Sequence, residues 1–165
     1  MKKVLRVVPV LTAALVAAAF VVGVASAGQA KIVVFKAKYA GTAAVQVTDN
    51  LANIQAKGKG AGTLIKASTV TGKGIGDAAQ QPCVPFTGPG VMSNTTGTKI
   101  LFKVLPGSEG CGDEEGNVFS ISGRAQITGG TKLYKKAKGT LKLTGVYDRG
   151  AGTFSITFTG KITVP

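Results

Sequence analysis

The strict alternation of apolar and polar side chains at the end of the chain is the feature that most limits how it can fold. Within residues 153–164, every second position carries Phe, Ile or Val, with Gly at 160, and Thr, Ser and Lys lie between them. A period of two places successive side chains on opposite faces of a strand. The pattern therefore predicts one β-strand with an apolar face toward a core and a polar face toward water.

The same alternation recurs along most of the chain. Residues 140–147 carry it, and the Gly-containing segment 148–152 joins them to the last strand, which predicts a β-hairpin. Further strands are predicted at 33–39, 45–47, 99–104 and 119–127, and weaker ones at 51–57 and 62–71. Turns are expected at 49–50, 58–62, 72–76, 129–130 and 150–152. About eight antiparallel strands at this spacing favour an all-β fold, a closed barrel or a sandwich.

Two stretches lack the alternation and are predicted to be long loops. Residues 76–97 are rich in Pro and Gly, and residues 106–117 are rich in acidic side chains. Loops of such length in a small domain are often functional, so we expect a site at the end of the barrel that carries them. The alternative is that they are variable surface loops without a core of their own.

Each of these stretches contains one of the two cysteines, Cys83 and Cys111. An even pair in a small exported domain predicts a disulfide, which would join the two loops across the strand at 98–105. The alternative, a reactive thiol, is disfavoured because the carboxylates around Cys111 oppose formation of a thiolate.

The first 27 residues have the pattern of a secretory signal peptide. Lys2, Lys3 and Arg6 precede an uncharged apolar run at 7–24, and Ala25-Ser26-Ala27 is a small-x-small cleavage sequence. We expect cleavage after Ala27, leaving residues 28–165 as a single secreted or cell-envelope barrel domain with no stable membrane span. Cleavage after Ala30 and retention as a membrane anchor are the alternatives.

The composition excludes several kinds of chemistry. The chain has no His and only two Cys, which rules out zinc sites of the Cys/His kind and catalysis by imidazole. We predict no metal and no cofactor. The acidic residues at 109–117 could bind Ca²⁺ through carboxylate oxygens, but they do not follow the EF-hand order, and a solvated loop is the favoured reading. Residues 58–62 lack the Gly-Lys-Ser/Thr ending of a phosphate-binding loop.

Lysines give the chain its basic character. Without residues 1–27 the chain keeps 17 Lys+Arg against 7 Asp+Glu, a net charge of +10. The densest cluster comprises Lys132, Lys135, Lys136 and Lys138. A purely solubilising, edge-protecting lysine surface is the favoured interpretation, and nonspecific attraction of polyanions of the cell envelope is the alternative. The exposed strand faces lack the aromatic side chains that stack on bases, so specific nucleic-acid binding is not expected.

Residues 127–141 read Ile-Thr-Gly-Gly-Thr-Lys-Leu-Tyr-Lys-Lys-Ala-Lys-Gly-Thr-Leu. This segment resembles the I-x-G-G-T-G-x-F-x-x-A-x-G-x-L pattern of dirigent proteins and allene oxide cyclase-like barrels, a pattern also frequent in bacterial exported proteins. Lys132 and Tyr134 replace the Gly and Phe of the pattern. The resemblance covers residues 121–160 and implies a calycin-like antiparallel barrel of about eight strands. It carries over no catalytic residue, because the polar residues that those families use inside the barrel lie outside this motif.

The inward positions of the expected barrel are almost wholly apolar. We therefore predict that the lumen binds a small apolar ligand without catalysis, or that the domain is a structural module of the cell surface. The lumen residues expected to contact a ligand are Phe35, Tyr39, Phe102, Phe119, Tyr147, Phe154 and Phe158. The alternative is an enzyme of the cyclase or dirigent kind, for which Tyr39, Tyr134 and Tyr147 are the only phenol donors.

Overall fold

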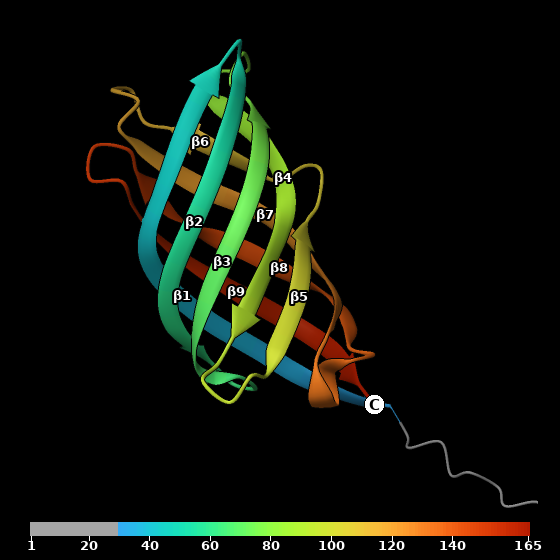
Figure 1. Cartoon of the computed structure of the whole chain (residues 1–165). Helices are drawn as coiled ribbons and strands as arrows, with labels where there is room; N and C mark the ends of the chain where they lie inside the picture. Colours follow the sequence, from blue (N-terminus) through green and yellow to red (C-terminus); the bar gives the residue numbers. More distant parts are fainter. Residues whose placement is uncertain (1–29) are drawn as a thin grey trace, which may run out of the picture.

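The computed structural model describes residues 30–165, so the expected signal peptide lies outside the described residues. The chain folds into antiparallel strands and one short 3₁₀ helix (Figure 1). In chain order these are β1 (Lys31–Thr48), β2 (Leu51–Gly62), β3 (Lys66–Asp77), β4 (Cys83–Ser93), β5 (Lys99–Val104), β6 (Glu109–Gly112), β7 (Val118–Gly130), η1 (Lys132–Tyr134), β8 (Lys138–Asp148) and β9 (Thr153–Val164).

The strands form a closed antiparallel barrel in which most neighbours in the sheet follow one another in the chain, while β1 also pairs with β9, β4 with β6 and β5 with β7. β1 is 18 residues long; residues 31–42 pair with β9, and residues 37–48 pair with β2. The pairing of β3 with β4 completes the ring. Eight strands close the barrel and β6 is an additional short one. The all-β antiparallel barrel is thereby confirmed; the alternation favoured it together with a sandwich, and the resemblance implied it.

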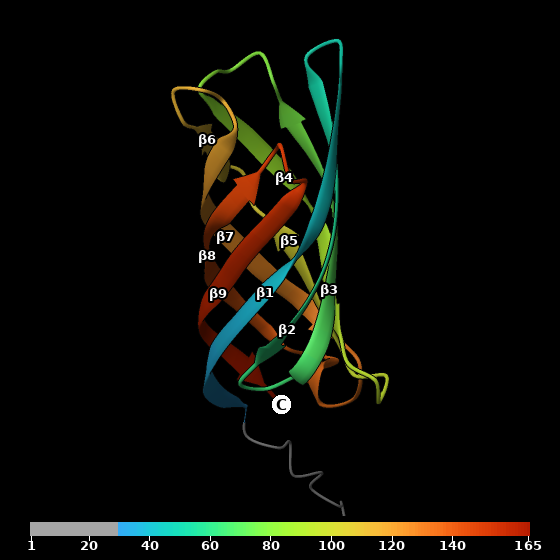
Figure 2. The same ribbon diagram turned by 90° about the vertical axis from the view of Figure 1, so that its left-hand side faces the viewer.

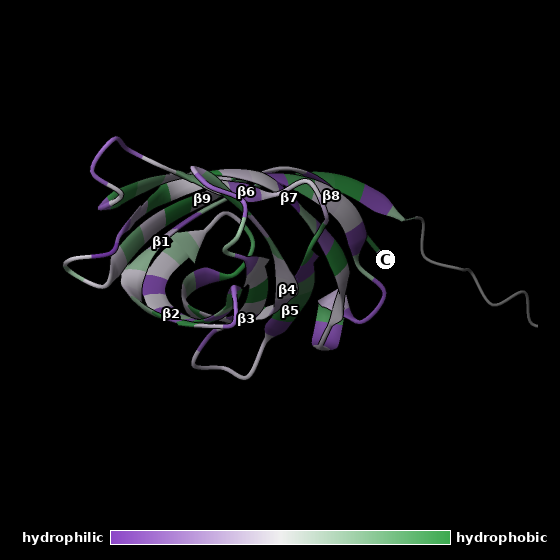
Figure 3. Ribbon diagram, turned by 90° about the horizontal axis from the view of Figure 1, so that it is seen from above, coloured by the Kyte–Doolittle hydropathy of each residue, from purple (hydrophilic) through white to green (hydrophobic). Residues whose placement is uncertain are grey.

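The two ends of the barrel differ, and each is named here for later use. The mouth carries the connections at 49–50, 78–82, 113–117 and 149–152. The closed end carries the connections at 63–65, 94–98 and 131–137, together with the start of β1 and the end of β9. Figure 2 shows the closed end at the bottom, with the C-terminus beside it. Seen from above in Figure 3, hydrophobic and hydrophilic residues alternate along the strands, as a barrel wall with one inner and one outer face requires.

β5 and β6 share one position in the barrel wall, which corrects the prediction of an acidic loop over 106–117. β5 pairs with β4 and β7 toward the closed end, and β6 pairs with the same two strands toward the mouth. Between them the chain bulges at residues 105–108, where the buried Ser108 hydroxyl donates to the Leu105 carbonyl at 2.8 Å. That hydroxyl also accepts from the Arg124 amide at 3.1 Å, so it replaces backbone pairs that the bulge breaks.

The prediction of a loop over 76–97 is wrong for most of that stretch. Residues 83–93 form β4, which has strand partners on both sides. The pairing of β3 with β4 is interrupted between Gly90 and Thr87. Pro89 lies in this gap and has no amide hydrogen to donate to the ladder. The Pro and Gly residues that break the apolar–polar alternation of β4 thus lie where its pairing with β3 is interrupted.

The turns predicted at 58–62 and 72–76 are also wrong, because both glycine runs lie inside strands. The chain actually turns at 63–65. In β2 an added Cβ on the inward glycines would collide with the β1 backbone and with aromatic rings: one on Gly60 would meet the Lys38 carbonyl oxygen and Cδ1 of Tyr39, and one on Gly58 would lie 2.7 Å from the Ala40 carbonyl oxygen and 2.8 Å from Cζ of Phe154. Close approach of the β1 backbone and of aromatic rings, not a change of direction, requires glycine here.

The half of the barrel next to the closed end is a packed core. Phe158 makes edge-to-face contacts with Tyr39 and Phe102, at centroid distances of 6.3 and 5.1 Å. The largest fully buried apolar side chains of this core are Tyr39, Phe35, Phe158, Ile65, Met92, Ile100, Ile127, Leu141 and Ile162. Tyr134 of η1 covers this end and donates a hydrogen bond to the Leu64 carbonyl at 2.9 Å. Within residues 30–165, no helix is long and apolar enough to cross a bilayer.

Two tyrosines in this core make the free energy of unfolding sensitive to pH in the alkaline range. Burial raises the pKa of Tyr39 and of Tyr134 above the ordinary value of 10.0, and for Tyr39 a hydrogen bond with Ser68 partly offsets the effect. The folded state therefore holds these protons more tightly than the unfolded chain does. The stability that they contribute is complete below pH 10 and is lost as pH rises through their folded-state pKa values.

We expect the free energy of unfolding to fall steeply above about pH 10, and less steeply in Tyr39→Phe and Tyr134→Phe. Urea denaturation measured from about pH 8 to pH 12 tests this. Equal alkaline slopes in the variants and the unsubstituted protein would contradict it.

Candidate functional site

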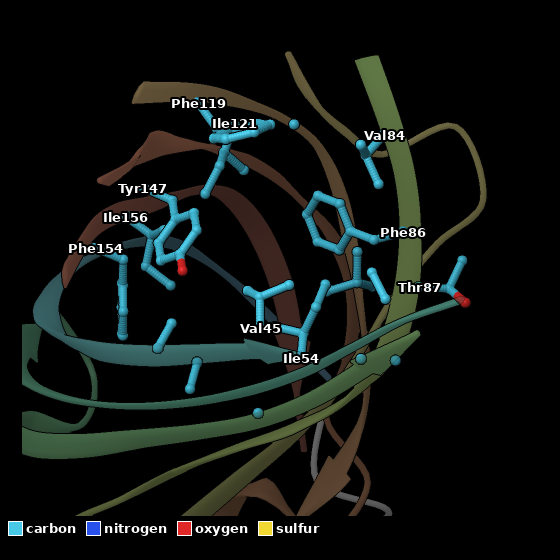
Figure 4. Close-up of a pocket in the computed structure, with 18 of the residues that line it drawn as sticks. Val45, Ile54, Val84, Phe86, Thr87, Phe119, Ile121, Tyr147, Phe154 and Ile156 are labelled. Carbon is cyan, nitrogen blue, oxygen red and sulfur yellow. The ribbon is translucent and has the colours of Figure 1, made fainter. Parts of the chain in front are cut away.

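The mouth half of the barrel contains an apolar cavity of about 180 Å³. It extends from the rings of Phe102 and Phe158, which form its floor on top of the packed core, to Gln81 and Arg149 at the mouth. Figure 4 shows side chains of β1 and β2, among them Val45 and Ile54, facing those of β7 and β8, among them Ile121 and Tyr147, across it. Such a cavity is of the size and lining that admit one ring-sized apolar group, since a dry cavity of about 150 Å³ binds benzene.

The cavity exists because one wall is built from small side chains. At the inward positions of β1, β2 and β3 near the mouth the chain carries mostly Ala and Gly, including Ala43, Ala56 and Gly72. At Gly72 an added Cβ would meet only the Pro89 carbonyl oxygen, at 3.8 Å. Space rather than close packing lies in front of this glycine, in contrast to Gly58 and Gly60 farther down the same wall.

The opposite wall is aromatic, and it contains most of the residues predicted to contact a ligand. Phe119 and Tyr147 lie with ring centroids 6.1 Å apart, and Phe154 follows on the next strand. With the floor residues, the predicted residues that line the cavity are Phe102, Phe119, Tyr147, Phe154 and Phe158. The other two predicted residues, Phe35 and Tyr39, are fully buried in the packed half and do not line the cavity.

Several lining residues were not among the predicted ones. Phe86 lies in the Pro- and Gly-rich part of β4, where the alternation is too irregular to show an inward position. Ile54 lies on a strand predicted only weakly. Val45, Ile121 and Ile156 were correctly placed on inward faces, but aliphatic side chains at such positions fill a core as often as they line a cavity. The small residues on the facing wall show that these aliphatic side chains line a cavity and do not fill a core.

The polar groups of the cavity are few and lie near the mouth. The hydroxyl of Tyr147 points into the cavity (Figure 4). The hydroxyls of Tyr39 and Tyr134, by contrast, are bonded to Ser68 and to the Leu64 carbonyl. The Arg149 guanidinium lies 5.3 Å from the centroid of the Phe119 ring, a cation–π distance, and lines the mouth. An occupant would thus meet apolar surface on most sides and hydrogen-bond donors only near its exit.

The expected disulfide is present, but its place differs from the prediction. Cys83 and Cys111 are direct partners on the adjacent strands β4 and β6, with an S–S distance of 2.09 Å. The bridge therefore fastens two paired strands at the mouth and does not cross a strand between two loops. The Glu109 carboxylate lies within 4.8 Å of the sulfurs, but the bridge leaves no thiolate there to ligate a metal.

All seven Asp and Glu residues of the chain lie at the mouth. Four of them are close together in the sequence, at 109–115, and the fold brings Asp49, Asp77 and Asp148 to the same end. Some of these carboxylates cap turns: Asp113 Oδ1 accepts from the Asn117 amide at 2.8 Å, and Asp148 Oδ1 from the Ala151 amide at 2.8 Å.

The predicted lysine cluster lies at the opposite, closed end. Lys132 is in η1 and its Nζ donates to the Thr96 carbonyl at 2.6 Å, while Lys135, Lys136 and Lys138 are exposed.

No protein-family model matches the chain, and no curated protein matches its sequence. Its function is therefore inferred from the cavity, the mouth and the closed end.

Proposed function

We propose that this protein is an exported β-barrel that binds a small apolar ligand in the mouth half of its lumen and catalyses no reaction on it. The open apolar cavity of about 180 Å³ carries this proposal. Ligand sites are typically concave and apolar with a few polar groups for orientation, which describes this half of the barrel. Export is supported by the signal-peptide pattern of residues 1–27 and by the disulfide, a bond typical of oxidising compartments.

The cavity also indicates what size of ligand fits. A group as large as one aromatic ring, or an alkyl chain of about six to eight carbons, would fill the space between the Phe102–Phe158 floor and the mouth. The Tyr147 hydroxyl can donate to, or accept from, a polar atom at the outer end of such a ligand. A longer ligand would project into water past Arg149.

An enzyme of the cyclase or dirigent kind is the alternative suggested by the sequence resemblance. Such an enzyme would need acid–base groups around the reacting atoms. Here the phenol of Tyr147 faces the cavity, whereas the other two tyrosines predicted as donors lie in hydrogen bonds of the packed half. The apolar lining supports binding better than catalysis.

A homologous series of linear 1-alkanols tests the proposed site by calorimetry. We expect affinity to rise by about 0.8 kcal/mol for each added CH₂ while the chain fills the cavity. The increase should stop at about six to eight carbons, where the alkyl chain reaches the mouth. Affinity that does not depend on chain length would contradict the proposal. Native mass spectrometry of protein purified from its host's medium would then show which molecule the cavity retains.

A further inference from the structure

The barrel is electrically polarised along its axis. Every Asp and Glu lies at the mouth, as described above, whereas strand starts and connections at the closed end carry exposed lysines. These closed-end lysines are Lys31, Lys66, Lys99, Lys132, Lys135, Lys136, Lys138 and Lys161. They come from β1, β3, β5, η1, β8 and β9, so the cluster seen in the sequence is only one part of a larger basic surface. Among the described residues, no Asp or Glu lies at this end.

An exposed leucine stands among these lysines. Leu133 of η1 is 74% exposed, the highest value among the large apolar side chains of residues 30–165. Its neighbour Tyr134 is buried and bonded to Leu64, and Ala137 is buried as well. Because these inward residues fix the segment on the barrel, Leu133 has to point outward between Lys132 and Lys135.

Two further exposed apolar residues lie at the same end, near the start of β1. Ile32 and Val34 are 67% and 68% exposed and face outward. Ile32 is opposite Thr163 of β9, and Thr163 is in turn opposite Lys138 of β8, so these three residues form one cross-strand row. Exposed apolar side chains and lysines therefore lie on the same end of the barrel.

We propose that the closed end docks on an anionic lipid bilayer, with Leu133 entering the interface and the closed-end lysines lying over the headgroups. Surfaces that combine basic and apolar side chains bind such interfaces by charge attraction and by burial of apolar area. A soluble polyanion would use the same lysines but would leave Leu133 in water, so the exposed leucine favours the bilayer.

The acidic mouth fixes the orientation of the docked barrel. The carboxylates of Asp49, Asp77 and Asp148 are repelled by the surface that attracts the lysines, and they lie at the far end of the barrel. The cavity then opens away from the membrane, where a ligand can enter and leave. This docking is independent of whether the cavity binds the apolar ligand proposed above.

Flotation with lipid vesicles tests the charge contribution. The probe is phosphatidylcholine with about one third phosphatidylglycerol at about 0.15 M salt, and each variant is produced in the same exporting host. We expect Lys135→Gln/Lys136→Gln to lower the partition constant about twenty-fivefold, which corresponds to about fivefold per lysine. The matched control is Lys57→Gln/Lys103→Gln, which removes the same charge from exposed side-wall positions. Equal losses in both variants would overturn the proposed orientation.

Tryptophan reporters test insertion directly, because the chain contains no Trp. We expect the emission of Leu133→Trp to shift to shorter wavelength on the anionic vesicles and to be quenched by brominated lipid. Leu51→Trp, at a 44% exposed position in the mouth, should show neither effect. A response of Leu51→Trp and none of Leu133→Trp would show that the mouth contacts the bilayer, and would overturn the proposal. Binding to heparin together with no spectral change on vesicles would assign the surface to a soluble polyanion and refute the proposal.

Discussion

In the variant Gly72→Phe, we expect binding of 1-octanol to weaken by at least about hundredfold, a loss of about 2.7 kcal/mol. The ring would occupy the cavity itself, because a Cβ at this position meets only the Pro89 carbonyl oxygen at 3.8 Å and the space beyond it is the site. The barrel should not be destabilised, since the backbone needs no adjustment and the new side chain buries apolar surface. We expect the free energy of unfolding to stay equal or to rise by about 1 kcal/mol.

The control for this variant is Thr71→Phe, which adds the same ring one residue earlier on the outer face of β3. We expect that protein to bind 1-octanol as the unsubstituted one does. Calorimetry gives the affinities, and urea denaturation shows that both variants are folded. A folded Gly72→Phe protein with undiminished affinity would show that 1-octanol binds somewhere other than the cavity.

The double variant Cys83→Ser/Cys111→Ser should lose about 3–4 kcal/mol of stability, the value expected for a closed loop with a sequence separation of 28. The bridge stabilises the barrel mainly by restricting the unfolded chain. It also fastens β6, which has only four residues, to β4 at the mouth. We therefore expect weaker ligand binding as well, because Gly110 of β6 and Val84 of β4 line the cavity.

Denaturation of the unsubstituted protein with and without a reductant provides the comparison. The reduced protein and the double variant should unfold at the same urea concentration, well below the midpoint of the oxidised protein. A second double variant with Ala at both positions separates loss of the bridge from any cost of the two hydroxyl groups. If the oxidised protein, the reduced protein and the Ser double variant unfold at the same midpoint, the bridge does not contribute to stability.

The alternation was sufficient to predict the fold class and most inward-facing residues. A period of two depends on local strand geometry, so it can be recognised in any segment where large apolar and polar residues alternate, as they do from Phe154 to Val164. It failed where inward positions are glycine or where proline interrupts the ladder. For that reason the pattern predicts turns at Gly58 and Gly72 and a loop over residues 83–93, where the structure has strands.

The candidate site was only partly predictable for a related reason. An inward aromatic residue has the same sequence pattern whether it fills a core or lines a cavity. Phe35 is fully buried next to large neighbours, whereas Phe154 lines the cavity near the alanines of the small-residue wall. Which of the two occurs depends on the size of side chains that come from other strands and from distant positions in the chain.

The sequence by itself determined that the chain forms antiparallel strands with one apolar face, that its two cysteines can pair, and that its surface is basic. These properties follow from local periodicity, from composition and from the number of thiols. The tertiary structure alone decided that one half of the interior is hollow and that acids and closed-end lysines lie at opposite ends. Both depend on the register and closure of the barrel, which bring residues as distant as Asp49 and Asp148, or Lys66 and Lys135, to the same end.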